Sequence, residues 1–305
     1  MRAVGKAPSK VIMIGEHFVV HGAEAISAAI PIYSYSYAYE SGKLEIFSKG
    51  YSYNSLKPVE RTILSISKEY NIPPKAKIVI KSDVPAGSGL GSSASILVAA
   101  ASSFMRLNGI DLKPEDILKH SLEGEKEIHS KPSGIDPATC TYGGIIRFRI
   151  GEKINMLRTP EKLSILVVNS NRRRKTSYLI KRVARMKEER SGTFSILSKY
   201  VDLLVKDACS SIKNYKLDSL GFMMTANHAI LSFIGVSTPE LDRIVEILLG
   251  KGCYGAKLTG AGGGGCVIAI PSSEETKEIQ NTLSRLGYDV FNVDVPAGGA
   301  ESWLE

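Results

Sequence analysis

The sequence predicts an α+β protein built from two domains. Short β patterns dominate the first 80 residues, helical patterns dominate from about Thr176 to Leu249, and the tail returns to strands around a charged helix. Because strands and helices are grouped in this way, a repeating parallel βαβ fold is not expected. The least periodic stretch near the middle lies between Gly151 and Pro160. We therefore expect a first domain of residues 1–155 and a second of residues 156–305.

The elements follow from local patterns taken in chain order. The first four strands are rich in β-branched, aromatic and aliphatic residues, and they are expected at Val11–Ile14, Ile30–Tyr39, Leu44–Phe47 and Lys77–Ile80. A run of small and apolar residues then predicts a buried helix that begins at Ser92 or Ser93 and ends before Gly109. The remaining elements are a helix at about Lys113–His129, strands at Gly144–Ile150 and Leu163–Asn169, helices over 176–249, strands at Cys266–Ile270 and Val290–Val295, and a helix at Ser273–Leu286.

Composition excludes several classes of protein. The chain has 305 residues, is 43% hydrophobic, and carries four cysteines whose spacing suits neither a metal motif nor a disulfide scaffold. Its most apolar tract, Leu90–Met105, is interrupted by serines and is shorter than the roughly 20 residues that a membrane span needs. The N-terminus does not read as a signal peptide, so we expect a cytoplasmic protein with no membrane partner. The net charge of +8 suits an anionic ligand, but no nucleic-acid module signature accompanies it.

The densest chemical signal is a glycine-rich segment, DVPAGSGLGSSAS, that runs from Asp83 directly into the predicted helix. Alternate glycines let backbone amides curl around an anion, and the start of the helix adds further N–H donors, so a phosphate is the natural ligand. The segment lacks the lysine of a Walker A loop and the spacing of a dinucleotide fingerprint. The alternative is a structural turn in which Ser92 caps the helix.

Two acids follow at positions where carboxylates can do chemistry. Glu125 shares a helical stripe with Leu118 and Leu122, so its carboxylate points along an apolar face; a local pair with a lysine or with His129 is the alternative. Asp136 lies between Gly134 and a proline, where an Asp can equally well be a helix N-cap. The residues alone leave both alternatives open.

A third glycine cluster, KLTGAGGGGC, begins at Lys257 and precedes an apolar strand. Four consecutive glycines carry a large entropic cost on ordering, which indicates a backbone that approaches another loop or a ligand closely. Near the N-terminus, Lys6, Lys10 and the segment Gly15-Glu16-His17 flank one short strand.

In this order the three clusters resemble the motifs of the GHMP kinases, named after galactokinase, homoserine kinase, mevalonate kinase and phosphomevalonate kinase. The segment KAPSKVIMIGEHFVVHG is most similar to the mevalonate kinase form of the first motif, and EGEKEIHSKPSGID is similar to the stretch that carries the metal-binding Glu and the catalytic Asp in that branch. Ser9 replaces a usual glycine, and Pro137 also departs from the pattern.

The resemblance implies a two-domain GHMP fold, with a first part like domain 2 of ribosomal protein S5, a ferredoxin-like second part, and ATP in the cleft between them. It implies that Asp136 and Lys10 are catalytic, that Ser93 and Glu125 hold Mg²⁺, and that Glu16, His17, Thr176, Gly260 and Ala261 contact the substrate. The residues implied to bind ATP are Pro85, Ala86, Gly87, Ser88, Gly89, Leu90, Gly91, Ser92, Ser93 and Ala94.

The implied reaction is transfer of the ATP γ-phosphoryl group to the 5-hydroxyl of (R)-mevalonate. Asp136 would accept the hydroxyl proton, and Lys10 would stabilise the developing charge. A phosphomevalonate or sugar kinase is the alternative within the family, and a non-catalytic nucleotide- or nucleic-acid-binding protein is the alternative outside it. A homodimer is expected from the same resemblance.

Overall fold

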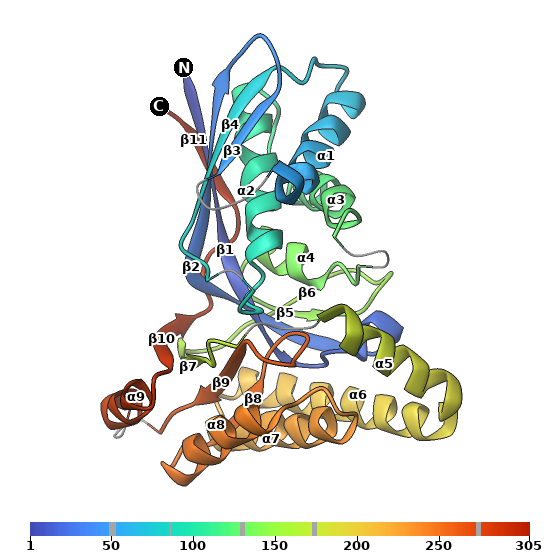
Figure 1. Ribbon diagram of the computed structural model, residues 1–305, viewed down its shortest axis with the longest axis vertical. Coiled ribbons are helices and arrows are strands. Elements are labelled where there is room, and N and C mark those ends of the chain that lie inside the picture. Colours follow the sequence, from blue (N-terminus) through green and yellow to red (C-terminus); the bar gives the residue numbers. More distant parts are fainter. Residues whose placement is uncertain (49–52, 86, 129–131, 173–175, 273–275) are drawn as a thin grey trace.

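The structure is a computed structural model that describes residues 1–305 except 49–52, 86, 129–131, 173–175 and 273–275. The side chains of residues 53–55 and 176–177 also lie outside the description. The predicted α+β class is confirmed, because the described elements form two sheets, each with helices packed against it (Figure 1).

The larger sheet is built mainly from the N-terminal half of the chain. Its strands are β1 (Arg2–Ile14), β2 (Ala25–Glu40), β3 (Glu45–Ser48), β4 (Ala76–Ser82), β5 (Ile145–Phe148), β6 (Asn155–Leu157) and β11 (Glu301–Leu304). The strand order is β11-β1-β2-β4-β3, while β5 pairs with β2 and β6 pairs with β5. The C-terminal strand β11 therefore lies at an edge of this sheet, where Glu301 is paired with Lys6 of β1.

Helices cover one face of the larger sheet (Figure 1). They are α1 (Tyr53–Glu69), α2 (Ser92–Leu107), α3 (Pro114–Glu125) and α4 (Ile135–Tyr142), and the short 3-10 helix η1 (Val19–His21) follows β1. Residues 94–105 of α2 are all buried, in keeping with their small and apolar character. The close packing reaches the backbone, because a Cβ added to Gly5 of β1 would lie 2.1 Å from the Ala99 carbonyl oxygen.

The smaller sheet has the strand order β10-β7-β9-β8 and is antiparallel throughout. Its elements are β7 (Leu163–Asn169), α5 (Thr176–Glu189), α6 (Ser191–Lys213), α7 (Leu217–Phe233), α8 (Pro239–Gly250), β8 (Gly255–Leu258), β9 (Cys266–Ile270), α9 (Thr276–Arg285) and β10 (Asp289–Val295). Numbered by chain position within this half, the strands lie in the order 4-1-3-2, with helical connections after the first and third. This is the βαββαβ arrangement of a ferredoxin-like fold.

The two halves share a continuous hydrophobic core at the end of β1. Val11 and Met13 of β1 belong to the same buried cluster as Val167 of β7 and Leu258 of β8. The chain that leaves β1, residues 15–17, lies against the smaller sheet, where Glu16 contacts Lys257 of β8. The domain boundary between residues 155 and 156 stays a prediction.

Most predicted elements are present, although β1 and β2 extend further than predicted and β5 is shorter. Helix α1 was not predicted, although Leu56, Val59, Ile63 and Ile66 form a buried stripe at helical spacing. Helix α4 and strands β6, β8 and β11 were also missed, because these short segments carry little hydrophobic periodicity of their own. In the described part of the chain, every helix is too short or too polar to cross a membrane.

Candidate active site

The glycine-rich segment connects β4 to α2 and begins that helix. Gly91 is the N-cap with φ +78°, and its carbonyl accepts the first backbone hydrogen bond of the helix from Ser95 at 2.9 Å. Ser88 is buried and its hydroxyl donates to the Pro85 carbonyl at 2.7 Å, which tightens the turn. The N-terminus of a 16-residue helix thus follows a compact turn, the arrangement that suits a phosphate group. Of the residues predicted to bind ATP, only Ala86 lies outside the described residues.

Lys10 and Asp136 form an ion pair next to this loop. The Lys10 ammonium Nζ lies 2.9 Å from Asp136 Oδ1, and the lysine is 1% exposed whereas the aspartate side chain keeps 30% of its surface open. The Lys10 backbone N–H donates to the Leu90 carbonyl at 2.9 Å, and a Cβ added to Gly91 would lie 2.9 Å from Lys10 Cε. Lys10 therefore links the glycine-rich loop to Asp136, which lies in the first turn of α4.

Glu125 is a buried carboxylate at the end of α3. It is 7% exposed, and its Oε2 has no hydrogen-bond partner among the described residues. Burial, reinforced by the charge of Asp136 and only partly offset by Lys10, raises the pKa of Glu125 to about 8. Among the described residues no lysine forms an ion pair with Glu125 Oε2, and His129 lies outside the described residues. An acid in this position is stabilised by a cation.

Ser93, the other predicted metal ligand, is the second residue of α2 and is exposed. A hydroxyl and a carboxylate are oxygen donors, and Mg²⁺ commonly takes few protein ligands because phosphate oxygens and waters complete its shell. The unpartnered, buried Glu125 oxygen therefore fits a magnesium ion brought with a nucleotide.

The segment that follows β1 contacts the hairpin loop between β8 and β9. His17 has a positive φ of 63°, unusual for a non-glycine residue, and its Nε2–H donates to the Ala261 carbonyl at 2.9 Å. Burial lowers the pKa of His17 to about 4, so its imidazole is neutral at physiological pH. Ala261 thus lies beside His17, and Gly260 precedes it in the chain; their contact with a substrate stays a prediction. Thr176 is the first residue of α5, but its side chain lies outside the description.

The four-glycine loop is held close to backbone on two sides. The Gly263 N–H donates to the Val236 carbonyl at 2.9 Å, and a Cβ added to Gly262, whose φ is +73°, would lie 2.2 Å from the same oxygen. The Cys266 N–H donates to the Ser88 carbonyl at 3.1 Å. The third motif therefore contacts the glycine-rich loop of the second motif, and the predicted close approach is confirmed.

Lys257 is a site residue that the sequence did not single out. It begins the third motif, is fully buried, and forms an ion pair with Glu16, which is itself 1% exposed. Glu16 therefore faces Lys257 rather than open space, and its role as a substrate contact stays a prediction. The available signal was a lysine within a short apolar strand, a pattern that is more often a surface residue.

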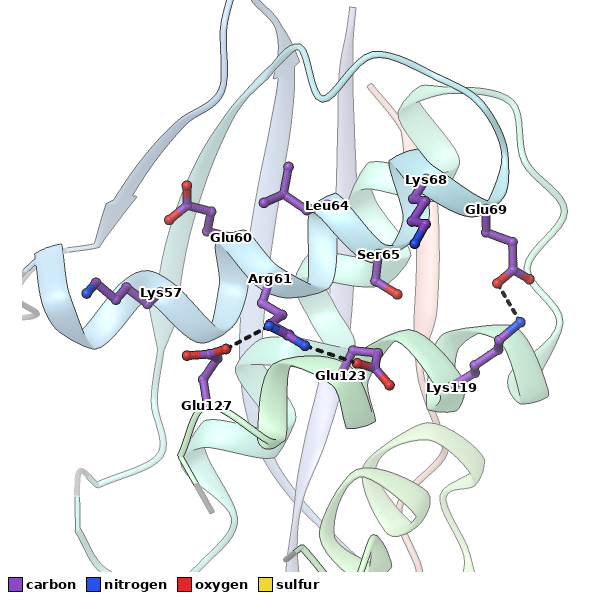
Figure 2. A pocket seen from close by; sticks show the side chains of 10 residues that line it. All are labelled: Lys57, Glu60, Arg61, Leu64, Ser65, Lys68, Glu69, Lys119, Glu123 and Glu127. Carbon is purple, nitrogen blue, oxygen red and sulfur yellow. Dashed lines mark hydrogen bonds and ion pairs between the residues drawn. The ribbon is translucent and has the colours of Figure 1, made fainter. Parts of the chain in front are cut away.

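A pocket in the described surface lies elsewhere, on the outer side of α1 and α3 (Figure 2). It has a volume of about 690 Å³, and ion pairs cross it between Arg61 and Glu123, at 3.6 Å, and between Arg61 and Glu127, at 3.1 Å. None of the predicted catalytic, phosphate-binding or substrate-binding residues lines it. This charged groove is therefore separate from the candidate active site.

Comparison with known proteins gives a consistent result. The family model for the GHMP kinases N terminal domain matches residues 57–144, and the model for the GHMP kinases C terminal region matches residues 210–289. A mevalonate kinase of Methanocaldococcus jannaschii is 36% identical, with 94% of this chain and 97% of that protein covered. One of Aeropyrum pernix is 31% identical, with coverage of 98% and 97%. The crystal structure of L. major mevalonate kinase in complex with R-mevalonate matches with a TM-score of 0.84 at 27% identity, covering 96% of each chain.

Proposed function

The chain belongs to the GHMP kinases and has their two-domain fold, and from this premise we propose that it transfers the γ-phosphoryl group of ATP to the 5-hydroxyl of (R)-mevalonate. Full-length relatives named mevalonate kinase support this acceptor over phosphomevalonate or a sugar. The observation that carries the proposal is the Lys10–Asp136 pair, 2.9 Å apart below the glycine-rich loop.

In the proposed reaction, Asp136 receives the proton of the 5-hydroxyl. The hydroxyl oxygen forms a bond to the γ-phosphorus, the bond from that phosphorus to the β–γ bridging oxygen breaks, and ADP leaves with the electron pair. Lys10 holds the Asp136 carboxylate in place and offers positive charge to the transferring group. Phosphoryl transfer depends mainly on positioning and charge neutralisation, so this pair and the loop provide much of what the step requires.

The ATP phosphates are proposed to bind the backbone N–H groups of Gly87 to Ser93, within a proposed ATP-binding segment that runs from Pro85 to Ala94 and includes Ala86. Ser93 and Glu125 are proposed to hold Mg²⁺, which would neutralise phosphate charge and orient the nucleotide. The buried, unpartnered oxygen of Glu125 supports this assignment. At neutral pH, loading of the metal would require that Glu125 lose its proton.

The polar end of mevalonate is proposed to bind near His17, between the residues that follow β1 and the loop that contains Gly260 and Ala261. Glu16 and Thr176 complete the proposed set. The hydrogen bond from His17 to Ala261 supports a site shared by the first and third motifs.

The decisive experiment measures ADP release by the purified protein with Mg²⁺-ATP and, in parallel, (R)-mevalonate, 5-phosphomevalonate, galactose and homoserine. Turnover of mevalonate alone is expected. Asp136→Asn should lower kcat by about 10²–10⁴-fold, whereas Asp218→Asn, an exposed acid in the first turn of α7, should leave it unchanged. Full turnover by Asp136→Asn would remove this residue as the base, and no turnover of any of the four acceptors would remove the proposed function.

A homodimer is also proposed. Ile196, Tyr200 and Leu203 are exposed and recur at helical spacing on α6, and the neighbouring α7 exposes Phe222 and Phe233. Large apolar side chains gathered on adjacent helices are typical of an interface. Light scattering after gel filtration should give about twice the 33.0 kDa chain mass, and Leu203→Glu should halve it. A wild-type mass of one chain at micromolar concentration would contradict the dimer.

The cytoplasmic location stays a prediction.

A further inference from the structure

Lys257 and Glu16 form an ion pair that is closed off from solvent. The lysine ammonium donates to Glu16 Oε1, to the Leu258 carbonyl at 2.7 Å and to the Ile12 carbonyl at 3.3 Å. Both side chains are at most 1% exposed, and Glu16 Oε2 has no hydrogen-bond partner among the described residues. The pair joins two segments that lie 241 positions apart in the sequence.

The pair is the centre of a larger connection between the end of β1 and the end of β8. Thr259 accepts a hydrogen bond from the Ile12 N–H at 2.9 Å and donates one to the Ile12 carbonyl at 3.1 Å. Two residues further along, the Ala261 carbonyl accepts from His17. Lys257, Thr259 and Ala261 on one segment thus contact Ile12, Glu16 and His17 on the other.

Stability alone is a weak reason to retain such a pair. Removing two charges from water is costly, and well-packed apolar residues in place of a buried pair are often neutral or stabilising. The unpartnered Glu16 oxygen adds to this cost. The neighbouring residue gives a different reason, because His17 follows Glu16 directly and adopts a backbone conformation that side chains disfavour. Something must hold that turn, and the only charged side chain that contacts Glu16 among the described residues is Lys257.

We propose that Lys257 is a positioning residue for the phosphoryl acceptor, which acts through Glu16 to hold His17 against the loop of the third motif. This inference rests on the proposed function, because the acceptor is proposed to bind at His17. Lys257 does not touch the acceptor itself. It positions His17, which is proposed to contact the acceptor. Loss of Lys257 should therefore weaken acceptor binding, while ATP binding through the glycine-rich loop remains.

The test compares Lys257→Met, Glu16→Gln and the double variant. Lys257→Met leaves a buried, unpaired carboxylate and should lower Tm, whereas the double variant removes both charges and should recover Tm. The KM for mevalonate should rise about 10- to 100-fold in Lys257→Met and stay raised in the double variant, while the KM for ATP changes less than about threefold. Arg147→Met is the matched control, because it breaks an ion pair with the buried Glu24, which directly precedes β2, and should lower Tm without changing either KM.

The decisive outcome is the double variant. Recovery of Tm with a KM for mevalonate raised no further than in Glu16→Gln supports the positioning role, because Lys257 then acts only through Glu16. Recovery of both Tm and KM overturns it, since the pair would then be structural only, and a KM raised well beyond that of Glu16→Gln overturns action through Glu16. An unchanged KM in Lys257→Met overturns it as well. If Lys257→Met does not fold, the double variant carries the comparison alone.

A second readout separates this inference from the proposed function. In the wild type, the His17 ring should titrate at about 4 by NMR, with the signal assigned through His17→Gln. Burial is the largest cause of the low His17 pKa and the charge of Lys257 is the smallest, so loss of that charge alone should leave the pKa well below its ordinary value. Loosening of the turn in the double variant should instead move it towards the ordinary histidine pKa near 6.5. If the wild type does not phosphorylate mevalonate but His17 behaves in this way, the proposed function fails and the positioning role remains; an unshifted His17 in the double variant overturns the positioning role.

Discussion

Replacing Glu125 by glutamine should stabilise the metal-free protein at neutral pH, and the gain should grow as the pH rises. The pKa of Glu125 is about 8 in the folded protein, whereas an unfolded glutamate titrates near about 4.3. Between these values the folded state keeps a proton that the unfolded state has lost. Stability from this group is therefore complete below the unfolded pKa and is lost as the pH rises through the folded pKa.

The magnitude follows from the two pKa values. For one group with these values, the free energy of unfolding should fall by about 2–3 kcal/mol between pH 5 and pH 7. Glutamine binds no proton in either state, so this component is absent from the Glu125→Gln variant. The difference between wild type and variant isolates it, because other titrating groups contribute to both.

Urea unfolding at pH 5, 6, 7 and 8 without metal provides the assay. Glu123→Gln is the matched control on the same helix: the hydrogen bond from Lys126 lowers the pKa of Glu123, and the charges of Lys126 and Arg61 act in the same direction. Glu123 therefore contributes stability above the unfolded pKa that is lost as the pH falls, the opposite sign. Parallel curves for wild type and Glu125→Gln would show that Glu125 is ionised in the free protein, and would refute its description as a buried acid that needs a cation.

Three further predictions concern the loops and the imidazole of the site. Gly91→Ala should lower kcat, because a Cβ there would lie 2.9 Å from Lys10 Cε and displace the ammonium from Asp136; wild-type kcat in the variant would contradict this. Gly262→Ala should cost about 2 kcal/mol or more in urea unfolding, since its φ is +73° and the Cβ would meet the Val236 carbonyl at 2.2 Å, and a loss under about 1 kcal/mol would show that the loop is free to move. For His17, with a pKa of about 4, stability should be lost as the pH falls from about 6.5 towards 4, because the unfolded histidine takes up its proton first. Urea unfolding of His17→Gln over this range should give a flatter curve, and an equal slope would place the His17 pKa near its ordinary value.

Local patterns accounted for much of the fold. Helix α2 and strand β7 were predicted closely because a long run of small apolar residues and a continuous buried strand are recognisable without knowledge of their neighbours. The N-terminal part of β1 was not, because Arg2–Val4 become a strand only by pairing with β2 and with β11 from the other end of the chain. Edge pairing of this kind is a property of the assembled sheet.

The candidate site, like the fold, depends partly on local sequence and partly on tertiary contacts. By itself the sequence determined which residues could do the chemistry, since glycine spacing, helix periodicity and the placement of Glu125 and Asp136 are local properties. Only the tertiary structure decided that Lys10 contacts Asp136, that Lys257 pairs with Glu16, and that the buried Glu125 keeps one oxygen with no hydrogen-bond partner among the described residues. Backbone conformation and helical period depend on neighbours within a few residues, whereas a buried charge is defined by the side chains around it, and these come from segments more than 100 positions apart.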